Sequence, residues 1–429
     1  MKAALVGLAG FSVIAILIAL SLPPAAQPIS VATDLPNRSP YPGFIEPVSP
    51  SPSPSSATTP RPSQEPSSPS PAPTRTARPS PTALPTSNVI DLPADAIQTV
   101  PADNLWPYDG FAQFGPRVAS VTETGIKLVD LEHQTTTELY GTRRNERILS
   151  LDMSGDRVVW VVGKYDSNSR RVPCDIGGGL NWHIVAHEIS TGSEAEIASG
   201  RHIQRIGCAA WAPTVAIDGE FVAYAQEGND SSEWEIVVRS LASGEVVRTI
   251  GTGRVVADVD LDGMDVAFVN GVPDDPLSPY FVLTRRRLML SVATEPEPKL
   301  VERGASWSVS FAEGRMTWWI NPGTSSGQCW TASVEDLTPL RIAGDSYRVG
   351  SPRTSGDLVT YVAATETTAV GEIWVARTGM TYQLAPDIWV EGLFSNGGWL
   401  VWYGDRYSYG NEVTLVQGLP FAEVPVVGE

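Results

Sequence analysis

Four aspartates at close spacing are the residues of this sequence that most directly suggest chemistry. Residues 258–263 read DVDLDG, and another acid follows after Met264. Carboxylates at alternate positions before a glycine turn are the arrangement that a Ca²⁺ loop uses. The stretch is therefore a candidate calcium site, although a solvated acidic turn is the favoured interpretation. The predicted ligands are Asp258, Asp260, Asp262 and Asp265.

Tryptophan is a second source of candidate binding residues, because the chain has 13 of them. Exposed aromatic side chains often bind sugars or peptides. Four tryptophans fall near loops that we expect on one face of the fold, which makes them candidate binding residues, although core packing is the favoured interpretation of each. They are Trp182, Trp211, Trp234 and Trp330.

The three cysteines all follow residue 170. In an oxidising compartment one pair can form a disulfide, and one thiol is then left over. Cys174 and Cys208 lie in neighbouring repeat units at the same rim, so we predict a disulfide between them. Cys329 falls three units away and is expected to be a free, buried thiol.

Two motif matches are rejected on geometry. His183 and His187 read as HxxxH, but the surrounding pattern is that of a strand, where four residues span about 13 Å and cannot share one ion. Residues 323–327 match GxSxG, but they lie in a strand-to-strand loop and no histidine follows them. The order of a hydrolase triad is therefore not met.

A recurring sequence motif, called the repeated word below, organises the rest of the chain. MSGDRVVW at 153–160 has a glycine, a valine three residues later and an aromatic two residues after that, and related words follow further along. Successive glycines are 40, 64, 44, 51, 42 and 41 residues apart, which is the spacing of four-stranded propeller blades. The repeat glycines are Gly115, Gly155, Gly219, Gly263, Gly314, Gly356 and Gly397.

The strands of one blade can be assigned from each unit. The glycine makes the turn between the first and second strands, and the second strand is apolar on both faces because neighbouring blades cover it. Its aromatic residue fills the gap between blades. Thr-Gly and Ser-Gly pairs at 191–192, 243–244 and 378–379 supply the positive φ of a later hairpin turn. We predict an all-β propeller of seven blades, with six as the alternative if the weak first unit completes the last blade.

From about Trp106 to the end, these units resemble those of TolB-like β-propellers, which in turn resemble WD-repeat propellers. The resemblance implies an architecture and is nearly silent on function. The stretch DVDLDGMDVAFVNGVP also resembles the calcium loops of integrin-type propellers. It departs from them at its closing acid, because Asp265 comes one residue early and Val266 takes the usual place.

Chain direction sorts the loops onto two faces. Loops between second and third strands share one face with the connections between blades, and the glycine turns share the other. The two long insertions, Lys164–Asn181 and Asn270–Arg285, fall on the first face, so we expect ligand binding there.

The first 100 residues predict the cellular location of the protein. Residues 1–22 contain an apolar run long enough to cross a bilayer, preceded only by Lys2, so the rest of the chain is expected outside the cytoplasm. A signal anchor is favoured, and a cleaved signal peptide with secretion is the alternative. Residues 23–100 hold 20 of the 36 prolines and predict a disordered spacer. Residues 101–429 form the predicted propeller.

The net charge of −18 makes nucleic acid a poor partner. We find no paired-carboxylate or nucleophile motif, so the leading expectation is a monomeric, non-enzymatic propeller that binds a protein or a glycan at the cell surface. Its cofactor, if any, would be Ca²⁺. The alternatives are a hydrolase or lyase acting on cell-surface glycans, and a purely structural surface protein.

Overall fold

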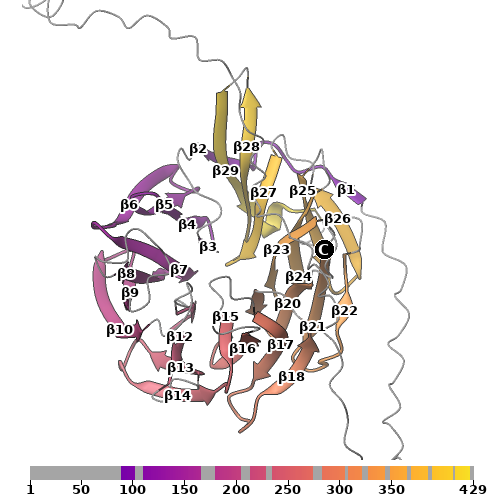
Figure 1. The fold of residues 1–429 in the computed structure, drawn as a ribbon. Helices are drawn as coiled ribbons and strands as arrows, with labels where there is room; N and C mark the ends of the chain where they lie inside the picture. The colour runs from indigo at the N-terminus through magenta and orange to yellow at the C-terminus, as the bar shows by residue number, and fades with distance from the viewer. Residues whose placement is uncertain are drawn as a thin grey trace, which may run out of the picture. The chain divides into compact units, whose positions relative to one another are not determined.

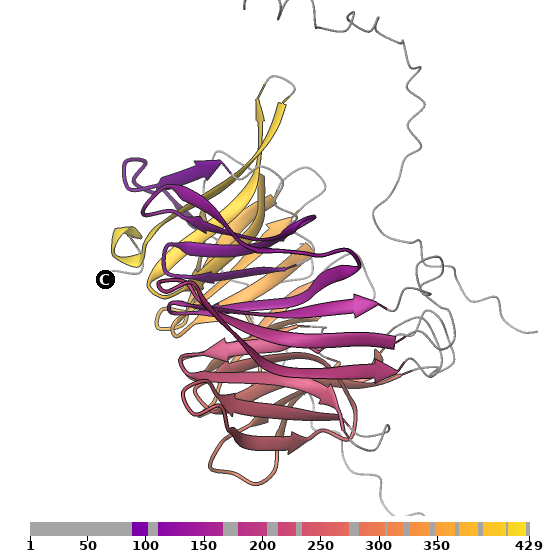
Figure 2. The same cartoon turned by 90° about the vertical axis from the view of Figure 1, so that its left-hand side faces the viewer.

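Seven β-sheets surround a central channel in the computed structural model (Figure 1). All the residues that it describes belong to one compact unit, Arg78–Glu429. Figure 2 shows the strands running from one face of the ring to the other. The predicted all-β propeller of seven blades is confirmed, and six blades are excluded. The described residues are 88–101, 110–165, 179–203, 213–228, 234–273, 283–304, 308–320, 327–343, 348–364, 369–384, 389–408 and 411–425.

The first four blades each contain four consecutive antiparallel strands, counted from the channel outward. Blade 1 consists of β3 (Phe111–Phe114), β4 (Arg117–Thr122), β5 (Gly125–Asp130) and β6 (Thr135–Gly141). Blade 2 consists of β7 (Glu146–Ser154), β8 (Arg157–Tyr165), β9 (Gly179–Glu188) and β10 (Ser193–Ile203). Blade 3 consists of β11 (Val215–Asp218), β12 (Phe221–Glu227), β13 (Trp234–Ser240) and β14 (Val246–Gly251). Blade 4 consists of β15 (Val255–Asp262), β16 (Asp265–Pro273), β17 (Leu283–Ser291) and β18 (Lys299–Arg303).

The last three blades follow the same order, and blades 6 and 7 each include one strand from the N-terminal side. Blade 5 consists of β19 (Val309–Ala312), β20 (Arg315–Ile320), β21 (Gln328–Ser333) and β22 (Leu340–Arg341). Blade 6 consists of β23 (Arg348–Ser355), β24 (Leu358–Ala364), β25 (Ala369–Val375), β26 (Met380–Leu384) and β1 (Asn88–Ile90). Blade 7 consists of β27 (Trp389–Asn396), β28 (Trp399–Ser408), β29 (Asn411–Pro420) and β2 (Gln98–Pro101), and the short 3₁₀ helix η2 (Phe421–Glu423) follows it.

The ring is closed by a strand from the start of the described chain. β2 pairs antiparallel with β29 and is the outermost strand of blade 7, while β1 pairs parallel with β26 at the edge of blade 6. Both cover a strand edge that would otherwise present unpaired backbone groups. The predicted boundary at residue 100 therefore falls inside the propeller, because residues 88–101 contribute two of its strands.

The repeated glycine makes the turn between the first two strands of every blade. At Gly155, φ is +59°, in the left-handed region that residues with a Cβ rarely adopt. The same holds at the other six repeat glycines, where φ lies between +53° and +74°. The turn assigned to the repeated word is confirmed in all seven blades.

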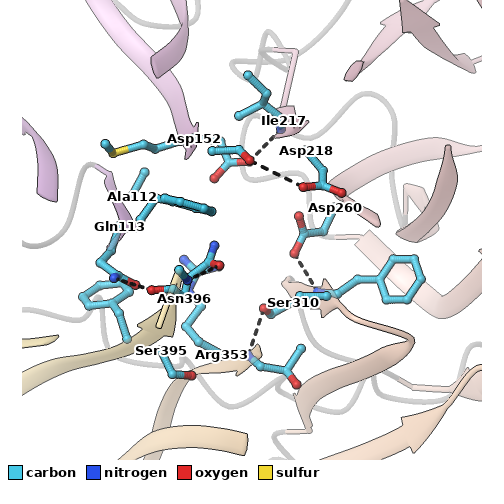
Figure 3. A pocket seen from close by; sticks show the side chains of 18 of the residues that line it. Ala112, Gln113, Asp152, Ile217, Asp218, Asp260, Ser310, Arg353, Ser395 and Asn396 are labelled. Atoms are coloured by element: carbon cyan, nitrogen blue, oxygen red, sulfur yellow. Dashed lines mark hydrogen bonds between the residues drawn. The ribbon is translucent and has the colours of Figure 1, made fainter. Parts of the chain in front are cut away.

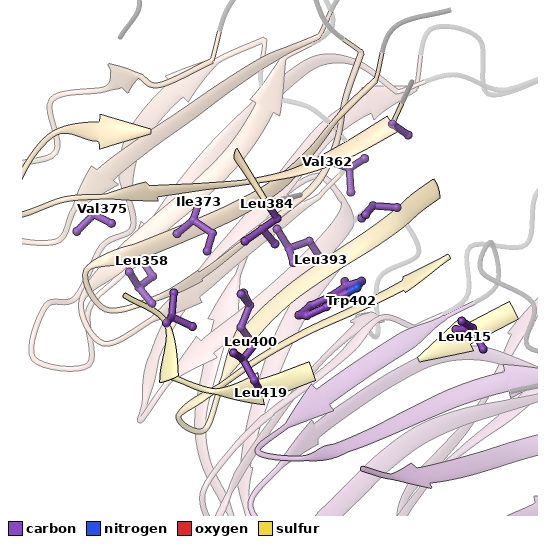
Figure 4. Packing of buried hydrophobic residues seen from close by; sticks show 13 residues of the cluster. Leu358, Val362, Ile373, Val375, Leu384, Leu393, Leu400, Trp402, Leu415 and Leu419 are labelled. Carbon is purple, nitrogen blue, oxygen red and sulfur yellow. The ribbon is translucent and has the colours of Figure 1, made fainter. Parts of the chain in front are cut away.

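The core consists of seams between neighbouring blades. Buried hydrophobic residues of the described chain form seven clusters, and each cluster joins side chains of two adjacent blades. Figure 4 shows the seam between blades 6 and 7, where Trp402 lies among leucines from both. The second-strand aromatics are buried as predicted. They are Trp160, Tyr224, Phe268, Trp318, Tyr361 and Trp402.

The predicted membrane helix and most of the predicted spacer, residues 1–87, lie outside the described residues. Within the described part, we find no helix with the length and apolar composition needed to span a bilayer.

Candidate functional site

A cavity of about 250 Å³ lies at one mouth of the central channel (Figure 3). The inner strands of all seven blades contribute to its wall, mainly at the ends that lead into the repeated glycine turns. The cavity therefore opens on the turn face, opposite the face that carries the long insertions. Its charged lining residues are Asp152, Asp218, Asp260, Asp262, Glu313 and Arg353.

Carboxylates and hydroxyls on the inner strands link one blade to the next. Asp152 on β7 accepts a hydrogen bond from the backbone N–H of Ile217 on β11 at 2.7 Å. Two residues to either side, the hydroxyls of Ser150 and Ser154 accept from the N–H groups of β11 and its turn, both at 3.1 Å. Alternate residues of a strand face the same side, so polar side chains at every second position of one inner strand all point to the next one. They pair with backbone N–H groups at every second position along its free edge.

The DVDLDG stretch forms the same ladder of hydrogen bonds between blades 4 and 5, in which alternate side chains accept from the backbone amides of the next inner strand. Asp258 accepts from the N–H of Val309 at 3.0 Å, and Asp260 accepts from the N–H of Phe311 at 2.7 Å. Asp262 accepts from the N–H of Gly314. The alternation that suggested a calcium loop therefore has another physical explanation, which is the satisfaction of inner-strand amides.

The fourth predicted calcium ligand points to a different partner. Asp265 accepts a hydrogen bond from the N–H of Ala293 at 2.6 Å, at the turn after the third strand of its own blade. Among the described residues, no three acids, histidines or cysteines gather with a geometry that could hold a metal ion. Calcium binding by these aspartates has no support in their geometry and stays a prediction.

The channel acids are electrostatically unusual. Burial raises the pKa of Asp152 to about 6 and that of Asp258 to about 7. It also raises the pKa of Asp260 well above the usual value, and the nearby Asp152 carboxylate adds to that rise. Backbone hydrogen bonds and the positive charge of Arg353 favour the ionised forms but only partly offset the loss of water.

We expect these acids to make the protein more stable at mildly acidic pH. Their folded-state pKa values lie above the usual Asp value of about 3.9, so the folded chain binds more protons than the unfolded chain between about pH 4 and 7. Their stabilising contribution is complete at the acidic end and is lost as pH rises through 6 to 7. Calorimetry should give a melting temperature at pH 5.5 that exceeds the value at pH 8 by at least about 3 °C.

The variant Asp152→Asn isolates this effect, since the amide oxygen can still accept from Ile217 but does not titrate. It should reduce the difference in melting temperature between the two pH values. Glu220→Gln, which removes an exposed acid on the same face, should leave the difference unchanged. Equal pH dependence in the wild type and Asp152→Asn would contradict the assignment.

Three of the four predicted binding tryptophans are buried in the seams between blades. Trp182, Trp234 and Trp330 are 7%, 6% and 8% exposed. The ring of Trp182 lies over Gly200, where an added Cβ would come within 2.4 Å of it. Trp211 lies outside the described residues. Core packing, the favoured interpretation of each, describes Trp182, Trp234 and Trp330. Ligand binding by any of the four tryptophans stays a prediction.

The cysteine predictions are tested only in part. Cys174 and Cys208 lie outside the described residues, so their disulfide stays a prediction. Cys329 is a free, fully buried thiol on β21, and burial raises its pKa to about 12. A thiol so rarely ionised is chemically inert at neutral pH.

The remaining motif predictions concern strands and loops. His183 and His187 lie on β9, so HxxxH is on a strand as predicted. Of the GxSxG match, only Gly327 lies among the described residues.

Sequence reasoning missed a second contact between blades, made by an arginine just after the repeated glycine. Its signal is visible in GDRVVW, where the arginine follows the glycine by two residues, and in GRMTWW, where it follows the glycine by one. In three blades this arginine donates to the turn of the next blade. The contacts are Arg117 Nη1 to Asp156 Oδ1 at 2.8 Å, Arg157 Nη1 to the carbonyl of Gly219 at 3.2 Å, and Arg315 Nε to the carbonyl of Gly356 at 2.9 Å.

Seven sheets joined through buried seams, with glycine turns at one channel mouth, define a seven-bladed β-propeller of four-stranded blades, the architecture that the repeat predicted. No protein-family model matches the sequence, and no curated protein matches it significantly.

Solved structures with a similar fold share little sequence with this chain. The β-propeller domain of the Trilobed protease from Pyrococcus furiosus is 12% identical, with a TM-score of 0.48 over 74% of this chain and 93% of that one. The Pyrococcus horikoshii acylaminoacyl peptidase is 13% identical, with a TM-score of 0.45 over 68% of this chain and 48% of the other. TolB from Acinetobacter baumannii is 13% identical, with a TM-score of 0.37 over 70% and 78%. The chain spans about half the length of the peptidase.

Proposed function

We propose that this protein is a membrane-tethered, extracytoplasmic β-propeller that acts as a non-enzymatic binding module for a protein or a glycan at the cell surface. The observation that carries the proposal is the uneven length of the middle hairpins. In blades 2, 4 and 7 the second and third strands have 9 or 10 residues each. In the other four blades they have 6 or 7.

In blades 2 and 4 the longer hairpins lead into the two long insertions, and in blade 7 the hairpin of β28 and β29 projects outward from the ring (Figures 1 and 2). Three extra residues per strand lengthen a hairpin by about 10 Å. Figure 1 shows β28 and β29 reaching beyond their neighbours at the top of the ring. The sequence indicated two of these blades through their insertions, and the blade 7 hairpin adds a third. Three lengthened hairpins at the ends of the blades away from the glycine turns favour recognition of a macromolecule over a flat structural contact.

The channel acids also favour binding over catalysis. Asp152, Asp258, Asp260 and Asp262 each use a carboxylate oxygen to hold an amide of the next blade. A group with this structural duty is poorly placed to donate and accept protons during turnover. The apolar run and the Pro/Ser-rich spacer support presentation of the propeller outside the cytoplasm.

Site-specific photo-crosslinking on intact cells tests which face binds. A photo-reactive amino acid at Lys164, which is exposed at the insertion end of β8, should crosslink a defined surface protein or retain labelled glycan. The same residue at Glu245, exposed in the glycine turn between β13 and β14, is the matched control on the opposite face. Crosslinks only from position 245, or from neither position, would contradict the proposal.

One observation favours a second candidate, an enzyme acting on cell-surface glycans. The channel mouth is rich in acids, and the pKa of Asp152 is raised into the range useful for a general acid. Incubation of the full-length protein with cell-wall and cell-surface glycans should then release reducing ends or unsaturated products. That activity should disappear in Asp152→Asn, whereas the binding module predicts no turnover with either protein.

A further inference from the structure

The charges around the channel-mouth cavity are divided between two sides. Figure 3 shows Asp152, Asp218 and Asp260 on one side and Gln113, Asn396 and Arg353 on the other. The acids come from blades 2, 3 and 4, and the basic and amide side chains come from blades 6, 7 and 1. A ligand that matches both sides must carry a cationic group and an acceptor.

The acidic side carries more negative charge than the described lining residues balance. Five lining carboxylates belong to blades 2 to 5, and Arg353 is the one cation among the lining residues. Each ladder carboxylate also keeps lone pairs, since a carboxylate accepts about four hydrogen bonds. A bound cation would be attracted to this side and would favour the ionised form of the buried acids.

Arg353 has hydrogen-bonding capacity to spare. Its guanidinium lies 5.8 Å from the ring centre of Phe394. It influences the buried acids through its charge, yet in the described part of the chain no hydrogen bond or ion pair engages its five N–H groups. A guanidinium with open donors binds a carboxylate through two parallel hydrogen bonds.

Gln113 provides an independent sign of a missing partner. Its side chain is only 5% exposed and lines the same cavity. The Nε2 group donates to the carbonyls of Gly115 and Asn396 at 2.6 and 2.9 Å. Its Oε1 atom is buried and has no hydrogen-bond partner in the described structure. Buried polar atoms are rarely left unpaired in folded proteins, so this one points to a donor from outside the chain.

We propose that the channel mouth on the turn face binds a small carboxylate with a net positive charge, of the basic amino acid class. The carboxylate pairs with Arg353, the cationic side chain lies against the acids of blades 2 to 5, and a donor of the ligand satisfies Gln113. The cavity volume of about 250 Å³ is below the range of drug-sized pockets, which fits a ligand of this size. The same chemistry occurs in a free basic amino acid and in a peptide that ends in arginine or lysine.

Isothermal titration calorimetry of the full-length protein in detergent tests this without any variant. L-Arginine should bind at least about tenfold more tightly than agmatine, which has the same guanidinium but lacks the carboxylate. L-Glutamate should not bind. Gly-Gly-Arg and its C-terminal amide distinguish the two sources. A peptide end is the ligand only if the free-acid peptide binds with an affinity equal to or higher than that of arginine and the amide, which lacks the carboxylate, binds more weakly.

Three variants locate the site. Arg353→Lys keeps the charge but loses the forked geometry, so the ratio of arginine to agmatine affinity should fall toward one. Glu313→Gln should weaken the binding of both arginine and agmatine. Glu220→Gln, on the same face but outside the cavity lining, should leave the binding of both unchanged. Melting temperatures close to that of the wild type would show that the variants fold.

The proposal is overturned if arginine, lysine and Gly-Gly-Arg fail to bind at millimolar concentration. It is equally overturned if agmatine binds the wild type as tightly as arginine, a comparison that needs no variant to fold. An unchanged affinity ratio in a folded Arg353→Lys protein would place binding elsewhere.

Discussion

Replacing Trp160 with alanine is expected to lower the free energy of unfolding by about 3–5 kcal/mol, as truncation of a large core aromatic does. Its ring is fully buried in the seam between blades 1 and 2. Ring centroids of Tyr140 and His187 lie 5.5 and 6.0 Å away, so no small movement of one side chain fills the space. Equilibrium urea unfolding followed by circular dichroism measures the change.

Trp399→Ala is the matched control, because Trp399 is half-buried at the edge of another seam. It should cost only about 1–2 kcal/mol, in proportion to the smaller apolar area that it removes from water. Equal losses for the two variants would show that the seam aromatic has no special role. The repeated word would then need a different explanation.

Replacing residues 98–101 with Gly-Ser-Gly-Ser is expected to destabilise the propeller by about 2–4 kcal/mol, through lost burial of a valine and a lost hydrogen-bond chain. Val100 is 5% exposed in the seam between blades 7 and 1. Thr99 accepts from Gln417 at 3.1 Å, and Gln417 accepts from the indole of Trp402 at 2.9 Å. The same variant should aggregate more readily, because β29 becomes an unpaired edge.

A replacement of residues 51–54 by the same four residues controls for the change in composition. That stretch belongs to the predicted spacer, and its replacement should leave the urea midpoint and the aggregation rate unchanged. Light scattering during thermal unfolding measures the aggregation of both variants. A fully stable 98–101 variant would mean that the ring does not depend on β2 for closure.

The blade architecture could be predicted because it depends on local chemistry repeated many times. Gly155 must adopt a positive φ, and the strand after it must be apolar on both faces. Each requirement therefore selects recognisable residues, a glycine and then an apolar run, at a fixed spacing. Seven copies make the pattern hard to produce by chance. The number of blades, their strand order and the burial of Trp160 and its equivalents follow from these marks.

The candidate site could be predicted only in part, because its residues meet through contacts between blades. Asp258 and Asp260 attracted attention by their spacing, but a spacing of two suits both a calcium loop and a strand that faces a neighbour. Which one applies depends on the edge of β19, some 50 residues further along the chain. Arg353 has no local signal in the sequence, because the acids that line the cavity with it come from other blades.

The sequence by itself determined the all-β class, the seven repeated units, the turn glycines and the aromatic seams, because hydrophobic periodicity and backbone conformation act within a few residues. Only the tertiary structure decided that β1 and β2 complete blades 6 and 7, that Trp182, Trp234 and Trp330 are buried, and that the charged cavity opens on the turn face. These features arise when strands distant in sequence meet around the channel. Burial and hydrogen bonding there are properties of the closed ring and not of any one segment.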